Sequence, residues 1–168
     1  MVLPPTSAAV QVYAVCAGVL YVKFLVTTMI QGRKTFRAGR RAPEDCKLPM
    51  AKGMPQQTYG LAKKNDCSPQ DAAMLAAQEE EQRWRAIVSN DLESMPFALV
   101  VFGAGILAES DERVQVGAMA VYTLARLGHT YAYAHSLQPH RMLFWMSGVL
   151  SLLVGVGNSV LGAVAHRR

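Results

Sequence analysis

Four long stretches of this sequence are almost free of charged residues, and they restrict the folds that are open to the chain. They run from about residues 8 to 30, 90 to 107, 114 to 134 and 142 to 165, and together they make up more than half of the 168 residues. A helix of roughly 20 apolar residues crosses the hydrocarbon core of a bilayer. Because these stretches are apolar nearly all round, the pattern predicts an all-α integral membrane four-helix bundle rather than a soluble helical domain.

Most of the charge lies in one block between the first and second stretches. The net charge is +5, and eleven of the seventeen Lys and Arg residues lie between Arg33 and Arg85. No base-reading motif accompanies this charge, so we expect no nucleic-acid partner. The positive-inside rule places the block in the cytosol and the acidic turn at 108–113 on the opposite side. The C-terminal Arg167 and Arg168 then also fall opposite, but the first loop carries far more charge.

A cleaved signal peptide is a second interpretation of the first stretch, because Ala14–Ala17 contains small residues typical of a cleavage site. No basic residue precedes this segment, and the apolar run continues past the position of cleavage. We therefore expect a membrane span, interrupted by Lys23, as the first element of a single domain that covers residues 1–168.

The region between the first two stretches divides into a loop and a charged helix. Residues 47–72 are rich in Pro, Gly, Lys, Asn and Gln and show no periodicity, so we expect a flexible cytosolic insert there. Ser68 and Pro69 have the order of an N-cap and a first helical residue, which predicts that a helix begins at this point. The acidic run Glu79–Glu81 is expected on a solvated face of that helix.

Three cysteines, Cys16, Cys46 and Cys67, form neither a CxxC pair nor any spacing that is typical of a metal site. The count is odd, and the basic loop that holds two of them is expected in the cytosol. We therefore expect free thiols and no bound metal.

Polar side chains enter the second stretch at helical spacing. Arg83, Asn90 and Glu93 are separated by seven and three residues, so they share one face of a helix. They lie where the charged helix runs into an apolar segment. Ionisable groups at such a place are energetically costly and usually mark a functional site.

The third stretch carries a matching set. Arg126, His129 and Tyr133 have offsets of three and seven residues, again one helix face. A central arginine in a membrane needs an anion, a cavity or an acidic partner. Glu93 is available as such a partner, and a purely structural Arg–Glu pair is one explanation of the pattern.

Five cations are expected near the same membrane edge, and these are Lys34, Arg37, Arg83, Arg126 and Arg141. One glutamate cannot neutralise five cations. The surplus of positive charge predicts a bound anion with more than one acidic group.

These residues resemble the MAPEG superfamily of membrane proteins in eicosanoid and glutathione metabolism. The similarity lies in the pattern Arg-x6-Asn-Asp-Leu-Glu-x2-Pro at Arg83–Pro96 and in Arg-x2-His-Thr-x2-Tyr at Arg126–Tyr133. Ala42–Asp45 is similar to the family's Asn-Pro-Glu-Asp turn, and Pro139–Arg141 is similar to its Pro-x-Arg. The subgroup that the sequence resembles most comprises microsomal glutathione transferase 1 and microsomal prostaglandin E synthase 1.

The resemblance implies a homotrimer that binds glutathione between neighbouring subunits near the cytosolic side of a membrane. The expected membrane is the endoplasmic reticulum, with the mitochondrial outer membrane as the alternative. The family's glutathione-site positions fall on seven residues here, which are Arg83, Asn90, Glu93, Arg126, His129, Tyr133 and Arg141. Lys34 stands where the family usually has Arg, Arg37 matches the next basic position, and Asp45 matches an aspartate proposed to act in the synthase.

The resemblance also implies roles for these residues. Glu93 would hold the amine of glutathione, and the arginines would hold its carboxylates and stabilise its thiolate, with Arg126 or Arg141 next to the sulfur. Because a thiolate is the nucleophilic form of a thiol, neighbouring guanidinium groups would activate it. The expected second substrate is a lipophilic electrophile or a lipid hydroperoxide that arrives through the membrane lipid.

Departures from the family pattern decide between its members. Val88 and Ser89 replace a His and an Arg, and Met142 replaces the Ser proposed to activate the thiol in the synthase. Cys46 directly after Asp45 is similar to the transferase, so we expect a glutathione transferase or peroxidase. A prostaglandin E synthase-like isomerase and a non-catalytic adaptor of the lipoxygenase-activating type remain alternatives. A small transporter is a weaker one, since no broken helix or internal repeat supports it.

Overall fold

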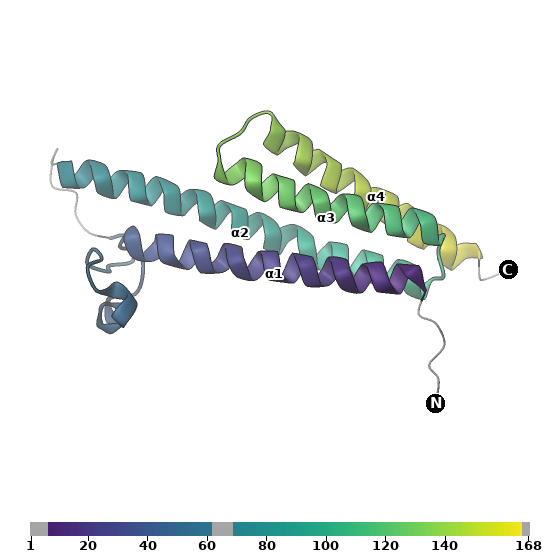
Figure 1. Cartoon of the computed structure of the whole chain (residues 1–168), viewed down its shortest axis with the longest axis horizontal. Helices are drawn as coiled ribbons and strands as arrows, with labels where there is room; N and C mark the ends of the chain where they lie inside the picture. Colours follow the sequence, from purple (N-terminus) through teal and green to yellow (C-terminus); the bar gives the residue numbers. More distant parts are fainter. Residues whose placement is uncertain (1–6, 62–68, 166–168) are drawn as a thin grey trace. The chain divides into compact units, whose positions relative to one another are not determined.

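The computed structural model describes residues 7–61 and 69–165, and this part of the chain is helical and contains no β-strand. Its elements are four α-helices and two short 3-10 helices (Figure 1). In chain order they are α1 (Ala8–Arg37), η1 (Pro43–Lys47), η2 (Pro49–Ala51), α2 (Pro69–Leu107), α3 (Glu112–Ala134) and α4 (His140–Ala165). The all-α prediction is confirmed. Ser68, the expected N-cap of α2, and Cys67 lie outside the described residues.

The chain divides into two compact units. Unit 1 comprises Met1–Phe24 and Asn90–Arg168, and unit 2 comprises Leu25–Ser89. Helices α1 and α2 each contribute one part to unit 1 and the other part to unit 2. Each unit is described separately below, and the expectation of a single domain over residues 1–168 stays a prediction.

Unit 1 has a small apolar core to which α1, α2 and α3 contribute. Its fully buried members include Ala98, Phe102, Met119 and Tyr122, and the rings of Phe102 and Tyr122 meet edge to face at 5.8 Å. Such edge-to-face pairs are a favoured aromatic geometry. The Tyr122 hydroxyl also shares a hydrogen bond of 2.7 Å with Ser94, which satisfies a polar group inside the core.

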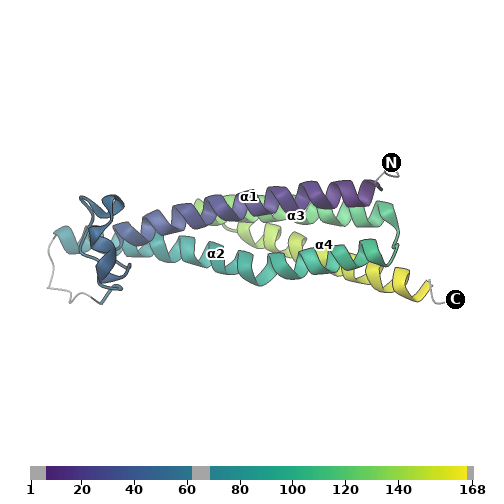
Figure 2. The same cartoon turned by 90° about the horizontal axis from the view of Figure 1, so that it is seen from below.

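Helices α3 and α4 pack along one another, and both views show them side by side (Figures 1 and 2). Asp111 caps α3, because its carboxylate accepts a hydrogen bond of 2.9 Å from the backbone N–H of Val114. Gly128 of α3 allows the close approach to α4, since a Cβ there would lie 2.5 Å from the ring of Phe144. Small residues let membrane helices approach in this way.

Three of the described helices are long and apolar enough to cross a membrane, namely α1, α2 and α4. Helix α3 covers the third predicted span, 114–134, but it is less apolar and is not among these three. Gln115, Arg126 and His129 lower the mean hydropathy of α3, and all three are buried within unit 1. Helix α3 therefore buries a polar face, and the other three helices bury fewer polar residues in the part of the chain that the structure describes.

Unit 2 is held together by ion pairs and by a folded loop. Glu81 is fully buried and pairs with Arg40 at 2.8 Å and with Arg85 at 2.7 Å, although the acidic run was expected on a solvated face. Residues 47–61 were expected to belong to a flexible insert, but the structure folds them into η2 and a series of hydrogen-bonded turns. Gly60, with positive φ, allows one of these turns, and Gly39, also with positive φ, allows the turn directly after α1.

Candidate functional site

A buried ionic triad joins three helices of unit 1. The carboxylate of Asp91, on α2, accepts hydrogen bonds from Lys23 Nζ of α1 at Oδ2 and from Arg126 Nη2 of α3 at Oδ1, the latter at 2.5 Å. The exposed fractions of Lys23, Asp91 and Arg126 are 8%, 0% and 3%. Two cations thus share one anion. With all three groups ionised, this buried triad carries a net charge of +1.

A second polar cluster lies where α3 ends and α4 begins. His129 is 3% exposed, and its ring meets that of Tyr133 edge to face with centroids 5.6 Å apart. The guanidinium of Arg141, on α4, lies 4.5 Å from the centroid of the Tyr133 ring, which is a cation–π contact. This contact fixes a half-buried cation against the polar face of α3.

Arg126 connects the two clusters, because it lies three residues before His129 on the same face of α3. Four buried polar atoms on this helix have no hydrogen-bond partner among the described residues, and these are Thr123 Oγ1, Arg126 Nε, His129 Nδ1 and Thr130 Oγ1. Nearly all buried polar groups in folded proteins are satisfied, so a concentration on one helix is unusual. With the positive charge beside it, this face suits a polar, negatively charged ligand.

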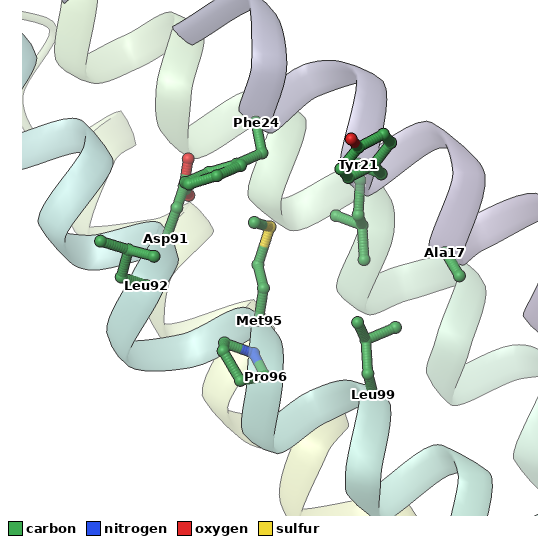
Figure 3. Close-up of a pocket in the computed structure, with 9 residues that line it drawn as sticks. Ala17, Tyr21, Phe24, Asp91, Leu92, Met95, Pro96 and Leu99 are labelled. Atoms are coloured by element: carbon green, nitrogen blue, oxygen red, sulfur yellow. The ribbon is translucent and has the colours of Figure 1, made fainter. Parts of the chain in front are cut away.

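An apolar groove opens beside the triad on unit 1 (Figure 3). It has a volume of about 220 Å³ and lies between the first part of α1 and the second part of α2. Phe24 and Asp91 mark one end of it, and Ala17 and Leu99 mark the other (Figure 3). Its other lining residues are Leu20, Tyr21, Leu92, Met95 and Pro96. Such a groove, open and nearly free of polar atoms, suits a lipophilic ligand.

The model of the MAPEG family matches residues 10–161, which is most of the chain and includes all four α-helices. The chain belongs to the MAPEG family. This family covers glutathione transferases, prostaglandin E synthases and activating proteins, and its members generally use glutathione and generally form trimers. No curated protein matches the chain.

The structure of this MAPEG protein brings some of the residues predicted for the site together. Arg126, His129, Tyr133 and Arg141 form the continuous set described above. The carboxylate that pairs with Arg126 is Asp91, whereas the sequence pointed to Glu93, which is exposed. Asn90 is half-buried and belongs to unit 1 as well.

Four other predicted site residues belong to unit 2. Lys34 pairs with Glu80 at 2.5 Å, and Asp45 pairs with Arg41 at 2.8 Å. Arg37 is exposed and Arg83 is half-buried. The ion pairs of Lys34 and Asp45 are exposed or half-exposed, so each is worth little in solution and leaves its side chain available to a ligand.

Sequence reasoning missed Asp91 and Lys23 of this MAPEG protein. The signal was present, because Lys23 interrupts an apolar span and a buried lysine in such a place needs an anionic partner. Asp91 and Glu93 are the two acidic residues of the second stretch. Their residue types do not indicate which one faces inward.

Proposed function

We propose that this MAPEG protein is a membrane-bound glutathione transferase or peroxidase, which activates the glutathione thiolate against lipophilic electrophiles or lipid hydroperoxides. The observation that carries the proposal is the contact of Arg141 with Tyr133, which joins α4 to the polar face that holds His129 and Arg126. Cations, an aromatic hydroxyl and unpartnered donors thereby converge in one unit. Glutathione offers the two carboxylates and the thiol that such a set would bind.

Arg126 and Arg141 differ in their ion pairs and in their burial. Arg126 already shares Asp91 with Lys23, whereas Arg141 takes part in no ion pair among the described residues. Arg141 is also half-buried rather than buried, so an incoming sulfur could reach it more easily. We therefore assign the thiolate contact to Arg141, and to Arg126 the support of negative charge through its unpartnered Nε.

The chemistry follows from the charge. A free thiol has a pKa of ~8.5, and each unit by which a nearby cation lowers that pKa corresponds to ~1.4 kcal/mol. A guanidinium in a partly dry site favours the thiolate, because it interacts with the charged form alone. The sulfur then forms a bond to carbon of the electrophile as the leaving group departs. With a hydroperoxide, the sulfur attacks the terminal oxygen, the O–O bond breaks, and the alkoxide leaves and takes a proton from water to become an alcohol. A second glutathione then converts the sulfenic acid into glutathione disulfide and water.

The resemblance to the family assigns roles to other predicted residues as well. Glu93 and Asn90 would hold the amine end of glutathione, and Arg83, Lys34 and Arg37 would hold its carboxylates. Asp45 belongs to the isomerase alternative rather than to the transferase. The apolar groove at Asp91 supports a lipophilic second substrate, because such molecules partition into the bilayer that α1 and α2 are apolar enough to cross.

The test is a titration of the detergent-purified protein with glutathione at neutral pH, followed by the ultraviolet band of the thiolate and, separately, by equilibrium dialysis. We expect the wild-type protein to bind glutathione and to produce the band. Arg141→Ala is expected to lose most of the band while binding weakens by less. Arg113→Ala is the matched control, because Arg113 is an exposed arginine at the other end of α3.

Three results would contradict parts of the proposal. Binding without a thiolate band in the wild type would remove the arginine mechanism. A band that survives in Arg141→Ala would move the thiolate contact to another cation. Absence of both binding and band would favour the non-catalytic adaptor.

A further inference from the structure

The loop that follows α1 begins close to the membrane edge. Helix α1 starts at Ala8, and about 20 of its residues are enough to cross the hydrocarbon core. At a rise of 1.5 Å per residue, its remaining residues up to Arg37 extend only on the order of 10–15 Å past that core. Arg33, Lys34 and Arg37 occupy this part of the helix, where lipid headgroups lie.

The same loop then turns back to the end of α1. Gln57 is fully buried, and its side-chain amide donates a hydrogen bond of 3.0 Å to the carbonyl of Phe36. The backbone N–H of Thr58 donates to Gly39 at 3.0 Å, and that of Tyr59 donates to Arg41 at 2.9 Å. Residues between these two anchored ends, from η1 through η2, are therefore held beside the last turn of a membrane helix and do not extend freely into the cytosol.

The loop exposes several large apolar side chains. Leu48, Met50 and Met54 are 41%, 63% and 37% exposed, and they alternate with the exposed cations Lys47 and Lys52. No acidic residue occurs from Cys46 to Asn65. Exposed apolar groups close together mark an interaction surface, and apolar side chains mixed with lysines are typical of segments that lie in a membrane interface.

We propose that residues 47–54 form a membrane-surface contact for anionic lipid. Leu48, Met50 and Met54 enter the boundary between headgroups and acyl chains, and Lys47 and Lys52 bind the negatively charged headgroups. Anionic lipid is the occupant that the charge favours, since Lys47 and Lys52 are the segment's only charged residues and the loop is tethered to the end of a helix that is apolar enough to cross the membrane.

The test uses the full-length protein in lipid nanodiscs. Cys16, Cys46 and Cys67 are replaced by Ser, which keeps a hydrogen-bond acceptor for the Gln57 N–H at position 46. An environment-sensitive fluorophore is then attached to Met50→Cys or, as the matched control, to Gln56→Cys. Gln56 is an exposed polar residue of the same loop. The nanodiscs contain either zwitterionic lipid alone or a mixture of zwitterionic and anionic lipid. Each kind is prepared with and without lipids that carry a nitroxide quencher on the upper acyl chain.

We expect the label at position 50 to emit at shorter wavelength than the label at 56 and to be quenched several-fold more strongly by the nitroxide lipids in anionic discs. Reversal of charge by Lys47→Glu and Lys52→Glu should reduce this quenching to the level of the control. Equal quenching at 50 and 56 would overturn the proposal. A blue-shifted label at 50 that nitroxide lipids do not quench would also overturn it, because protein and not lipid would then cover the segment.

Discussion

The ionic triad predicts an asymmetry between its members that can be measured. Asp91 accepts from both Lys23 and Arg126, so Asp91→Asn leaves two buried cations without an anion. Removal of one partner from a buried ion pair typically costs about 3–5 kcal/mol. Lys23→Met instead leaves Arg126 paired with Asp91 and replaces a buried charge by an apolar side chain of similar length. Its expected cost is at most about 1–2 kcal/mol, since such replacements are often neutral.

The double variant sharpens this prediction. In Lys23→Met/Asp91→Asn only one cation is left unpaired, so the double variant should be more stable than Asp91→Asn alone. The assay is unfolding of the purified protein from mild detergent by increasing sodium dodecyl sulfate, followed by circular dichroism and tryptophan fluorescence. A double-mutant cycle from these data gives the coupling of the two residues.

One outcome would refute the reasoning. If Lys23→Met destabilised the protein as much as Asp91→Asn did, the carboxylate would not be the shared counter-ion of two cations. The control is Arg113→Gln, which removes an exposed charge from the same unit and should change stability by less than about 0.5 kcal/mol.

Three more predictions follow from the site and the loop. Arg126→Ala should abolish turnover but leave the elution volume on size-exclusion chromatography unchanged, because Lys23 and Asp91 then remain as a neutral pair; full activity would exclude Arg126 from the reaction. Ala17→Trp should fill the end of the groove and lower the rate with a long-chain hydroperoxide about tenfold, with little change for a small soluble electrophile, and equal losses for both would argue against the groove as the lipid site. Gln57→Ala should leave the backbone N–H of Arg41 and the carbonyl of Phe36 without the hydrogen bonds that Gln57 makes to them, and each lost bond should lower the stability by about 1–3 kcal/mol. Hydrogen exchange of the loop should therefore become faster, and Gln56→Ala is the control.

The helices of unit 1 were largely predictable because a bilayer leaves few choices to an apolar chain. The boundaries of the first and fourth spans agree closely with α1 and α4, apart from the extra turns of α1 up to Arg37. The third span was harder, because one helix that packs its polar residues inward looks less apolar than a helix that faces lipid all round. Gln115, Arg126 and His129 contribute to that difference, and Arg126 and His129 were predicted as site residues because they are polar within an apolar stretch.

The counter-ion of Arg126 shows where spacing alone fails. Successive residues of an α-helix are turned by about 100°, so Asp91 and Glu93 point in nearly opposite directions. A face drawn through Asn90 and Glu93 leaves Asp91 outside it, and the packing of α1 and α3 that selects Asp91 involves residues far away in the sequence. The folding of residues 47–61 was missed for a related reason, since the partners of Gln57 lie about 20 residues earlier, at the end of α1.

The shared carboxylate also limits the order in which substitutions can accumulate during evolution. Lys23 can be lost first, because Asp91 and Arg126 remain a balanced pair. Loss of Asp91 is acceptable only in a lineage that has already lost at least one of the two cations. Among relatives of this protein, chains without an acidic residue at position 91 should therefore lack Lys at 23 or Arg at 126, whereas chains without Lys at 23 should commonly keep Asp91.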